Sequence, residues 1–309
     1  MLYEVKFNKI EFIAVWNSLH YGYVLLVLPF VLVVLSIKAY RWQRIIFHEG
    51  YSYSYYKVLR AYLSSYSVGV VTPGRLGELI KVYNLRDDIK NIDTVSAFRT
   101  VVLDRLFDMF FLLWFGLSGV LFYSHIFGKQ DKFLILLIVV LVIYIALSFW
   151  NFVHSSLNKK RSQSNKILEF IDNCLRSMFL PGNIVSWILS GIAYLIFFIG
   201  IKILFFSIGI QIPLIEVGFI ISMIGLLLLL PISVAGFGTR EAGLVYLLSF
   251  YTIDAETAIC FSLLQFSIFF ICGGLIGLIF WFYTPIPLSF IRKDYRNLWL
   301  KLSTRIKTK

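Results

Sequence analysis

Five long apolar stretches constrain the fold of this chain more than any other feature of its sequence. A helix needs about 20 mainly apolar residues to cross the hydrocarbon core of a bilayer. Stretches of that length cover Tyr21–Tyr40, Thr100–Tyr123, Phe133–Val153, Ile184–Ile208 and Ala258–Tyr283. We therefore expect an all-α, polytopic integral membrane bundle whose transmembrane domain covers residues 21–283.

The composition excludes the soluble classes of protein. Hydrophobic residues make up 59% of the 309 positions and charged residues only 15%, and the mean hydropathy is +0.81. Soluble domains are roughly 45–50% apolar and 25% charged. The net charge of +12 would suggest nucleic acid in a soluble protein, but here the positive residues lie between and beyond the apolar stretches. We therefore expect cytoplasmic loops beside anionic lipid and no nucleic-acid partner.

The positions of Lys and Arg predict the orientation of the chain, because cytoplasmic loops are enriched in both. We expect these basic residues on the cytoplasmic side: Lys38, Arg41, Arg44, Lys81, Arg86, Lys90, Lys159, Lys160, Arg161, Lys166, Arg176, Arg292, Lys293, Arg296, Lys301, Arg305, Lys307 and Lys309. Residues 1–20 lack a signal-peptide pattern and are expected to form an interfacial segment outside. Residues 284–309 are expected to be a basic cytoplasmic tail of a plasma-membrane protein.

Two further apolar stretches are interrupted near their middles. Val58–Tyr83 is broken by a segment with Pro73, Gly74, Arg75, Gly77 and Glu78, and Val217–Tyr251 by one with Gly236, Gly238, Arg240 and Glu241. Irregular backbone at membrane depth is tolerated only where protein or a water-filled cavity satisfies it, and paired breaks indicate a midplane site between inverted repeats. We expect two re-entrant hairpins that enter from opposite faces; ordinary surface loops or full spans are the alternatives.

A third polar cluster lies at the cytoplasmic start of the apolar stretch Thr100–Tyr123. Asp104 and Asp108 are four residues apart and share a helix face, and Arg105 reaches Asp108 at a spacing of three. A structural ion pair near the interface is the alternative interpretation. Each charge at a helix centre costs about 2.5–3.5 kcal/mol on insertion scales. The seven charged residues of the three clusters sum to a formal charge of −1, which predicts a mutually paired internal network.

The chemistry of these residues suits a lipid head group. The planar fork of Arg makes bidentate hydrogen bonds to phosphate, and backbone N–H groups at a helix N-terminus also favour anions. Carboxylates nearby would accept a cationic amine. A groove lined in this way would let a head group cross while the acyl chains stay in lipid.

The same three segments resemble the membrane region of the lysylphosphatidylglycerol synthase/flippase family. The resemblance covers roughly Tyr21 to Tyr283 and implies a domain that moves lipids, or lipid-linked head groups and glycans, between leaflets. Family members often begin with another transmembrane helix, which would precede Met1. Lysyl transfer is not expected, because this chain lacks the aminoacyl-transferring domain. The positions that the resemblance marks are Pro73, Gly74, Gly77, Glu78, Asp104, Arg105, Asp108, Gly236, Gly238, Arg240 and Glu241.

We therefore expect a flippase or transporter of a phospholipid or lipid-linked compound, with substrate bound at Arg75, Glu78, Asp104, Arg105, Asp108, Arg240 and Glu241. One alternative is a membrane glycosyl- or phosphotransferase that uses Asp87 and Asp88 to hold a metal. Another is an accessory subunit of an envelope-assembly complex that docks through the small-residue spacing of Gly273 and Gly277.

No catalytic residue, metal ligand or cofactor site is expected, because the sequence contains no HExxH, CxxC, GxSxG or Walker pattern. The three cysteines are too few and too badly spaced for a disulfide framework or a zinc site. The expected partner is membrane lipid, and no oligomeric state is predicted.

Overall fold

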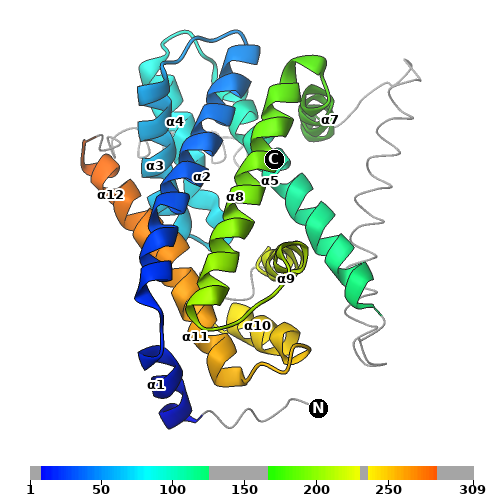
Figure 1. The fold of residues 1–309 in the computed structure, drawn as a ribbon. Coiled ribbons are helices and arrows are strands. Elements are labelled where there is room, and N and C mark those ends of the chain that lie inside the picture. Colours follow the sequence, from blue (N-terminus) through cyan, green and yellow to red (C-terminus); the bar gives the residue numbers. More distant parts are fainter. Residues whose placement is uncertain (1–7, 125–165, 230–235, 284–309) are drawn as a thin grey trace, which may run out of the picture.

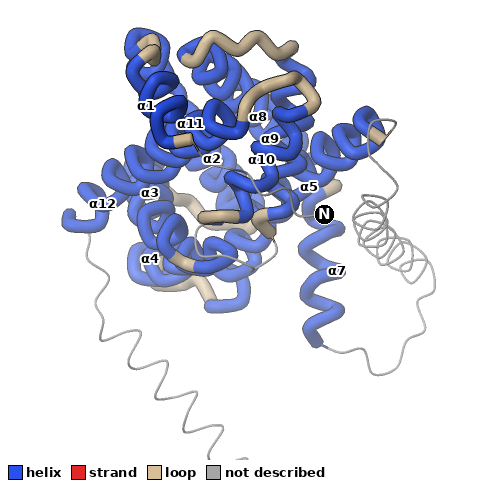
Figure 2. Tube along the Cα trace, turned by 90° about the horizontal axis from the view of Figure 1, so that it is seen from below, coloured by secondary structure: helices blue, strands red, loops and turns tan. Residues whose placement is uncertain are grey.

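The computed structural model describes residues 8–124, 166–229 and 236–283, and within these ranges the chain is helical and contains no strand (Figures 1 and 2). Four helical segments among these residues are long and apolar enough to cross a membrane: Tyr21–His48, Thr94–Tyr123, Pro181–Ser207 and Ala255–Tyr283. The molecule is therefore a multi-pass helical membrane bundle. The predicted span Phe133–Val153 and the tail 284–309 lie outside the described residues.

The described helices follow one another as α1 (Lys9–Asn17), α2 (Tyr21–His48), α3 (Tyr55–Val71), α4 (Ile80–Asp88), α5 (Thr94–Tyr123), α7 (Lys166–Met178), α8 (Ile184–Ser207), α9 (Leu214–Leu227), α10 (Thr239–Ser249), α11 (Ala255–Gln265) and α12 (Gly273–Tyr283). A 3₁₀ helix, Pro73–Leu79, joins α3 to α4, and another, Pro181–Asn183, precedes α8. A π-helical segment, Phe266–Cys272, joins α11 to α12 without ending the helix.

Helix α2 is longer than the sequence predicts. The apolar stretch ends at Tyr40, but the helix continues for two more turns because Trp42, Ile45 and Ile46 extend its buried face. Arg41, which the sequence places just beyond the end of the span, therefore lies within α2, and its side chain is fully buried in the bundle. Helix α5 likewise begins earlier than predicted, where the side chain of Asp93 accepts hydrogen bonds from the first turn.

Three helix pairs form the body of the bundle, α2 with α8, α3 with α12 and α5 with α9 (Figure 1). Helix α12 approaches α3 closely at two glycines. A Cβ atom at Gly273 would lie 2.9 Å from the ring of Tyr66, and one at Gly277 would overlap the carbonyl of Leu63. The small-residue spacing thus packs two helices of the same chain together.

Both interrupted stretches contain a helix break: the first lies between α3 and α4, and the second lies between α9 and α10, where residues 230–235 are outside the described residues. Helix α3 ends at Val71, the 3₁₀ helix follows, and the end of α4 returns to the start of α3, where Asp88 accepts hydrogen bonds from Tyr53 (2.6 Å) and Lys57 (3.1 Å). Helices α9 and α10 are similarly joined at their outer ends, because the hydroxyl of Tyr251 donates to Glu216.

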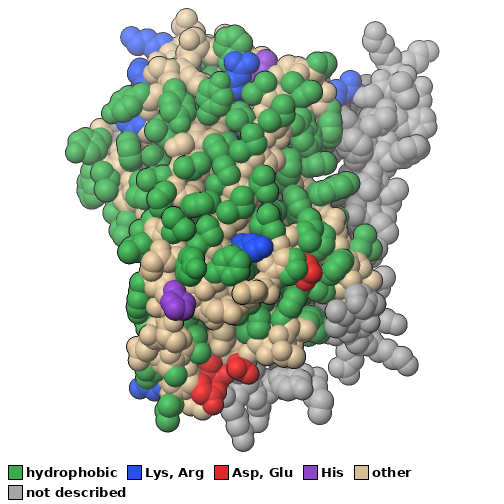
Figure 3. All heavy atoms as spheres, viewed as in Figure 1, with side chains coloured by type: hydrophobic (Ala, Val, Ile, Leu, Met, Phe, Trp, Pro, Cys, Tyr) green, Lys and Arg blue, Asp and Glu red, His purple; other side chains and the backbone are tan. Residues whose placement is uncertain are grey.

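These two broken segments start and end at opposite ends of the bundle. In Figure 1 the α2–α3 connection and the end of α4 lie at the top, whereas the α8–α9 and α10–α11 connections lie at the bottom. On the face of the bundle that Figure 3 shows, apolar side chains predominate between these ends. Exposed apolar residues on α2, α5, α8 and α12, such as Leu25, Trp114, Ile188 and Leu275, fit a lipid-facing surface.

Two shorter helices pack against the ends of the bundle. The connection between Val153 and Ile184, predicted to be a loop, contains helix α7, whose Cys174 and Met178 pack against buried residues of α2 and α5. Helix α1 falls in the expected interfacial segment, and its Phe12 and Trp16 pack against a cluster of buried residues formed by Leu19, Cys260 and Leu264.

Candidate functional site

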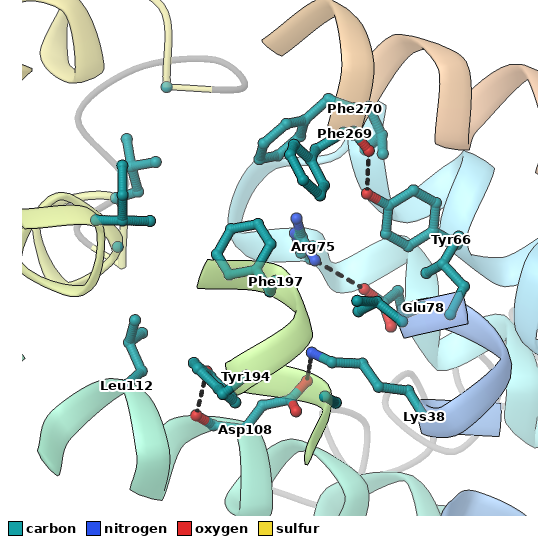
Figure 4. A pocket seen from close by; sticks show the side chains of 18 of the residues that line it. Lys38, Tyr66, Arg75, Glu78, Asp108, Leu112, Tyr194, Phe197, Phe269 and Phe270 are labelled. Atoms are coloured by element: carbon teal, nitrogen blue, oxygen red, sulfur yellow. Dashed lines mark hydrogen bonds and ion pairs between the residues drawn. The ribbon is translucent and has the colours of Figure 1, made fainter. Parts of the chain in front are cut away.

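One cavity of about 490 Å³ lies inside the bundle and is lined by residues from both helix breaks and from the Asp104–Asp108 segment (Figure 4). Helices α2, α3, α5, α8 and α9 and the π-helical segment all contribute to its wall. Most of the lining is apolar. Its charged residues are Lys38, Arg75, Glu78, Arg105, Asp108 and Arg240.

Glu78 lies at the end of the first break, where three cations surround its carboxylate. Arg75 Nη1 lies 3.8 Å from Oε1, Lys81 Nζ lies 3.5 Å from Oε2, and Arg105 contacts the same Oε2 atom. The Glu78 side chain is only 3% exposed, whereas Arg75 is 38% and Arg105 27% exposed. The carboxylate is therefore buried behind cations that face the cavity.

Asp104 lies deeper in the bundle and holds two fully buried cations. Its Oδ1 atom accepts hydrogen bonds from Arg41 Nε (3.1 Å) and Nη2 (2.7 Å), and its Oδ2 atom accepts one from Lys81 Nζ (2.9 Å). All three side chains are 0% exposed. A buried ion pair survives only when such geometry and additional hydrogen bonds offset the cost of desolvation.

Asp108 lies one turn further along α5 and lines the cavity. Arg41 Nη1 donates to its Oδ1 atom (2.8 Å) and Lys38 Nζ to its Oδ2 atom (3.0 Å). The hydroxyl of Tyr194 donates to the backbone carbonyl of Asp108 (2.8 Å), which ties α8 to α5 (Figure 4). Arg41 therefore bridges the two carboxylates of this helix face.

The second break places Arg240 and Glu241 at the first turn of α10. Arg240 Nη2 donates to Glu241 Oε1 (2.6 Å), and Arg240 Nε donates to the hydroxyl of Ser262 (2.8 Å). Glu241 Oε2 accepts a hydrogen bond from the backbone N–H of Gly238 (2.6 Å), which has a φ of +83°. The Arg240 side chain is 1% exposed, and its Nη1 atom has no hydrogen-bond partner among the described residues.

Aromatic rings connect the two breaks. The guanidinium carbon of Arg75 lies 5.1 Å from the ring centroid of Phe270, and that of Arg240 lies 6.0 Å from the same centroid. Phe266 lies under Arg240 at 4.6 Å and Tyr66 beside Arg75 at 5.4 Å, within the range of cation–π attraction. The π-helical segment supplies both phenylalanines, and Figure 4 shows Arg75 between Phe197 and this segment.

The structure brings five of the seven sequence-predicted charged residues to the cavity wall, namely Arg75, Glu78, Arg105, Asp108 and Arg240. Asp104 and Glu241 lie behind the wall, where Asp104 binds Arg41 and Lys81 and Glu241 binds the wall residue Arg240. Of the break residues, Gly236 lines the cavity, Gly77 packs against Val68, and Gly238 bonds Glu241. Pro73 and Gly74 begin the 3₁₀ helix.

Three cations of the network are not among the site residues that the sequence predicts: Arg41 and Lys81, which are fully buried, and Lys38, which is 18% exposed. The sequence analysis uses them only to assign the cytoplasmic side, so the formal charge of −1 is incomplete. With them the three motifs and their partners carry six positive and four negative charges. A signal was present, since Lys38 and Arg41 are three residues apart and Asp104 and Asp108 four apart, so that each pair lies on one helix face.

The chain was compared with known protein families, and the family model of the lysylphosphatidylglycerol synthase transmembrane region matches residues 2–277. The chain belongs to this family. The match covers both broken segments and the Asp104–Asp108 segment, and it confirms the resemblance that these three segments carry. A comparison with curated proteins gives no match.

Proposed function

We propose that this chain moves a phospholipid or a lipid-linked head group between the two leaflets of the plasma membrane. One observation carries the proposal: charged side chains from three separate motifs line a single cavity within a bundle whose outer surface is apolar. Ionisable residues inside a membrane domain are costly and generally mark a substrate pathway. Membership of the lysylphosphatidylglycerol synthase transmembrane-region family supports this interpretation.

The two broken segments act in this proposal as re-entrant hairpins that enter from opposite faces of the bilayer. Their outer ends are tied together by Asp88 at one end of the bundle and by Glu216 at the other, and both breaks contribute to the same cavity. Paired breaks of this kind are typical of transporters built from inverted repeats. Small movements of either hairpin would then open the cavity to one leaflet at a time, with residues 284–309 in the cytoplasm.

The charged wall would replace water around the head group during its passage. Arg75 and Arg240 present guanidinium groups suited to phosphate, and Lys38 and Arg105 add further positive charge to the cavity wall. The acyl chains would remain in lipid. We propose no catalytic step and no cofactor for this activity.

A transferase that uses Asp87 and Asp88 remains the alternative, and the contacts of Asp88 favour a structural role for it. Tyr53 and Lys57 donate to its carboxylate, and Arg60 lies 3.8 Å away, so its oxygens already hold the ends of α3 and α4 together. Metal-dependent turnover of a nucleotide-linked donor by the purified chain would support the transferase.

Reconstitution into liposomes tests the proposal. The full chain should expose fluorescent head groups from the inner leaflet faster than protein-free vesicles of the same lipid, and Arg240→Ala or Glu241→Ala should slow this exposure. If folded Arg240→Ala and Glu241→Ala variants moved a confirmed substrate at the wild-type rate, the assignment of the second break to the site would be wrong.

A further inference from the structure

The cavity carries an excess of positive charge that its own carboxylates do not neutralise. Four cations and two carboxylates line its wall: Lys38, Arg75, Arg105 and Arg240, and Glu78 and Asp108. Two further carboxylates lie behind the wall. Asp104 accepts hydrogen bonds from Arg41 and Lys81, and Glu241 accepts one from Arg240. This excess of positive charge favours an anionic ligand.

The carboxylates of the wall are already occupied by cations of the protein. Glu78 is contacted by three cations and is almost fully buried. Asp108 accepts from both Lys38 and Arg41, and Arg105 lies 4.0 Å from its Oδ2 atom. A cationic amine that approached either carboxylate would have to displace a cation of the protein, and the remaining cations would repel it.

The arginines of the two breaks, in contrast, keep donor capacity that faces the cavity. Arg240 is buried, yet its Nη1 atom has no hydrogen-bond partner among the described residues. Arg75 lies 3.8 Å from Glu78, beyond hydrogen-bonding distance, and its side chain is 38% exposed. Both guanidinium groups lie within 6.0 Å of the ring centroid of Phe270, so they reach the same region of the cavity.

We propose that this site selects a head group of net negative charge, whose phosphate binds between Arg75 and Arg240 over Phe270. The inference deepens the proposed function and rests on it. A phosphate oxygen would satisfy the buried Nη1 donor of Arg240, and the net charge of the phosphate would offset the excess of the wall. Head groups that add a cationic amine to the same phosphate would be bound less well.

Lipid retention by the purified protein tests this selectivity. The full chain is extracted from nanodiscs that contain equal amounts of phosphatidylglycerol, phosphatidylcholine and lysylphosphatidylglycerol with identical acyl chains, and retained lipid is counted by native mass spectrometry. We expect phosphatidylglycerol to be enriched about tenfold over each of the other two, because all three offer the same phosphate but only the other two add a cationic group that the excess positive charge of the wall repels. Equal retention of the three lipids would overturn the inference.

Variants locate the effect. Arg75→Gln should remove the enrichment, and Arg240→Lys, which keeps the charge but not the planar fork, should reduce it. Two control variants remove a cation that lies away from the cavity wall, and both should keep the enrichment. In Lys202→Gln the lost ammonium group lies over Phe206 on α8, and in Lys90→Gln it lies in the exposed α4–α5 connection. Enrichment that survived in both arginine variants would overturn the proposed site.

A competition experiment distinguishes whether the site binds the phosphate of a lipid head group or that of a free, soluble compound. Soluble glycerol 3-phosphate should not displace phosphatidylglycerol at matched concentration. If it did, the site would still select anions, but the lipid substrate of the proposed function would be contradicted. Conversely, retention of phosphatidylglycerol through Arg75 without any transfer between leaflets would uphold the inference and refute transport.

Discussion

Arg41 joins the two carboxylates of α5, Asp104 and Asp108, each of which also binds a lysine. Its guanidinium group donates to Asp104, to Asp108 and to the hydroxyl of Ser190 on α8, so one side chain connects three helices. Such an arrangement adds little net stability compared with apolar packing, but removing one member leaves the others unpaired. The network therefore fixes the positions of the cations that reach the cavity.

Asp104→Asn should lower the stability of the folded chain by about 3–5 kcal/mol, because it leaves Arg41 and Lys81 buried with too little negative charge. Thermal unfolding of the purified protein in detergent measures this change. Asp172→Asn is the matched control, since its ion pair with Arg176 (3.0 Å) lies on the surface of α7 and should contribute less than about 1 kcal/mol. Equal shifts in the two variants would contradict a buried network.

Arg75 has a backbone conformation that side chains rarely adopt, with a φ of +56°. Non-glycine residues in such a conformation cost about 1–3 kcal/mol and cluster at functional sites. We expect Arg75→Gly to leave stability unchanged or increase it while it removes lipid selectivity. Thr252→Gly is the control, because Thr252 has a φ of +57° in a turn away from the cavity.

Both the unfolding temperature and lipid retention have to be measured for Arg75→Gly and for its control Thr252→Gly. Unfolding temperature should rise or stay constant in both glycine variants, and lipid retention should fall only in Arg75→Gly. A loss of stability in Arg75→Gly with retention unchanged would show that the residue is structural and that the strain serves no substrate site.

Helix breaks were predictable from the sequence, and most helix ends were not. Pro73, Gly77, Gly236 and Gly238 interrupt apolar stretches too long to be loops, so the breaks could be placed to within a few residues. The end of α2 could not be predicted from the sequence, because the burial of Arg41 depends on carboxylates about sixty residues away in the chain. The π-helical segment has no sequence signal of its own, so the aromatic contacts of both arginines were also missed.

Gly77 tests the packing of the first break. A Cβ atom at this position would lie 2.6 Å from the backbone carbonyl carbon of Val68, so α3 and the 3₁₀ helix would have to separate. We expect Gly77→Ala to lower stability by about 1–3 kcal/mol. Gly274→Ala on α12 has open space around it and should be neutral or stabilising by up to about 1 kcal/mol. Thermal unfolding of both variants measures the difference, and a neutral Gly77→Ala would contradict the close packing.

The whole molecule combines an apolar exterior with charges concentrated inside. Its membrane class followed from the apolar stretches alone, because no soluble fold requires several of that length. The meeting of the three motifs at one cavity required the structure, since they are separated by about 25 to 130 residues of sequence. The net charge of the internal network could not be predicted either, because only the fold shows which basic residues lie inside the bundle.

The opposed arrangement of the two broken segments predicts which connections face the cytoplasm. Single cysteines introduced as Asn91→Cys, between α4 and α5, and as Asp254→Cys, between α10 and α11, should react with a membrane-impermeant reagent from opposite sides of sealed vesicles. Both positions are exposed. The background variant would replace Cys174, Cys260 and Cys272 by serine. Labelling of both positions from one side would contradict re-entry from opposite faces.

Transfer of labelled phosphatidylglycerol in proteoliposomes tests most directly whether the charged cavity is the path of the head group. The rate is measured for the wild-type chain, for Arg75→Gln and for Lys202→Gln, each reconstituted at equal density. We predict that Arg75→Gln is slowed about tenfold or more, as the loss of one charge-assisted contact implies, and that Lys202→Gln matches the wild type. Equal rates for Arg75→Gln and the wild type would contradict the account.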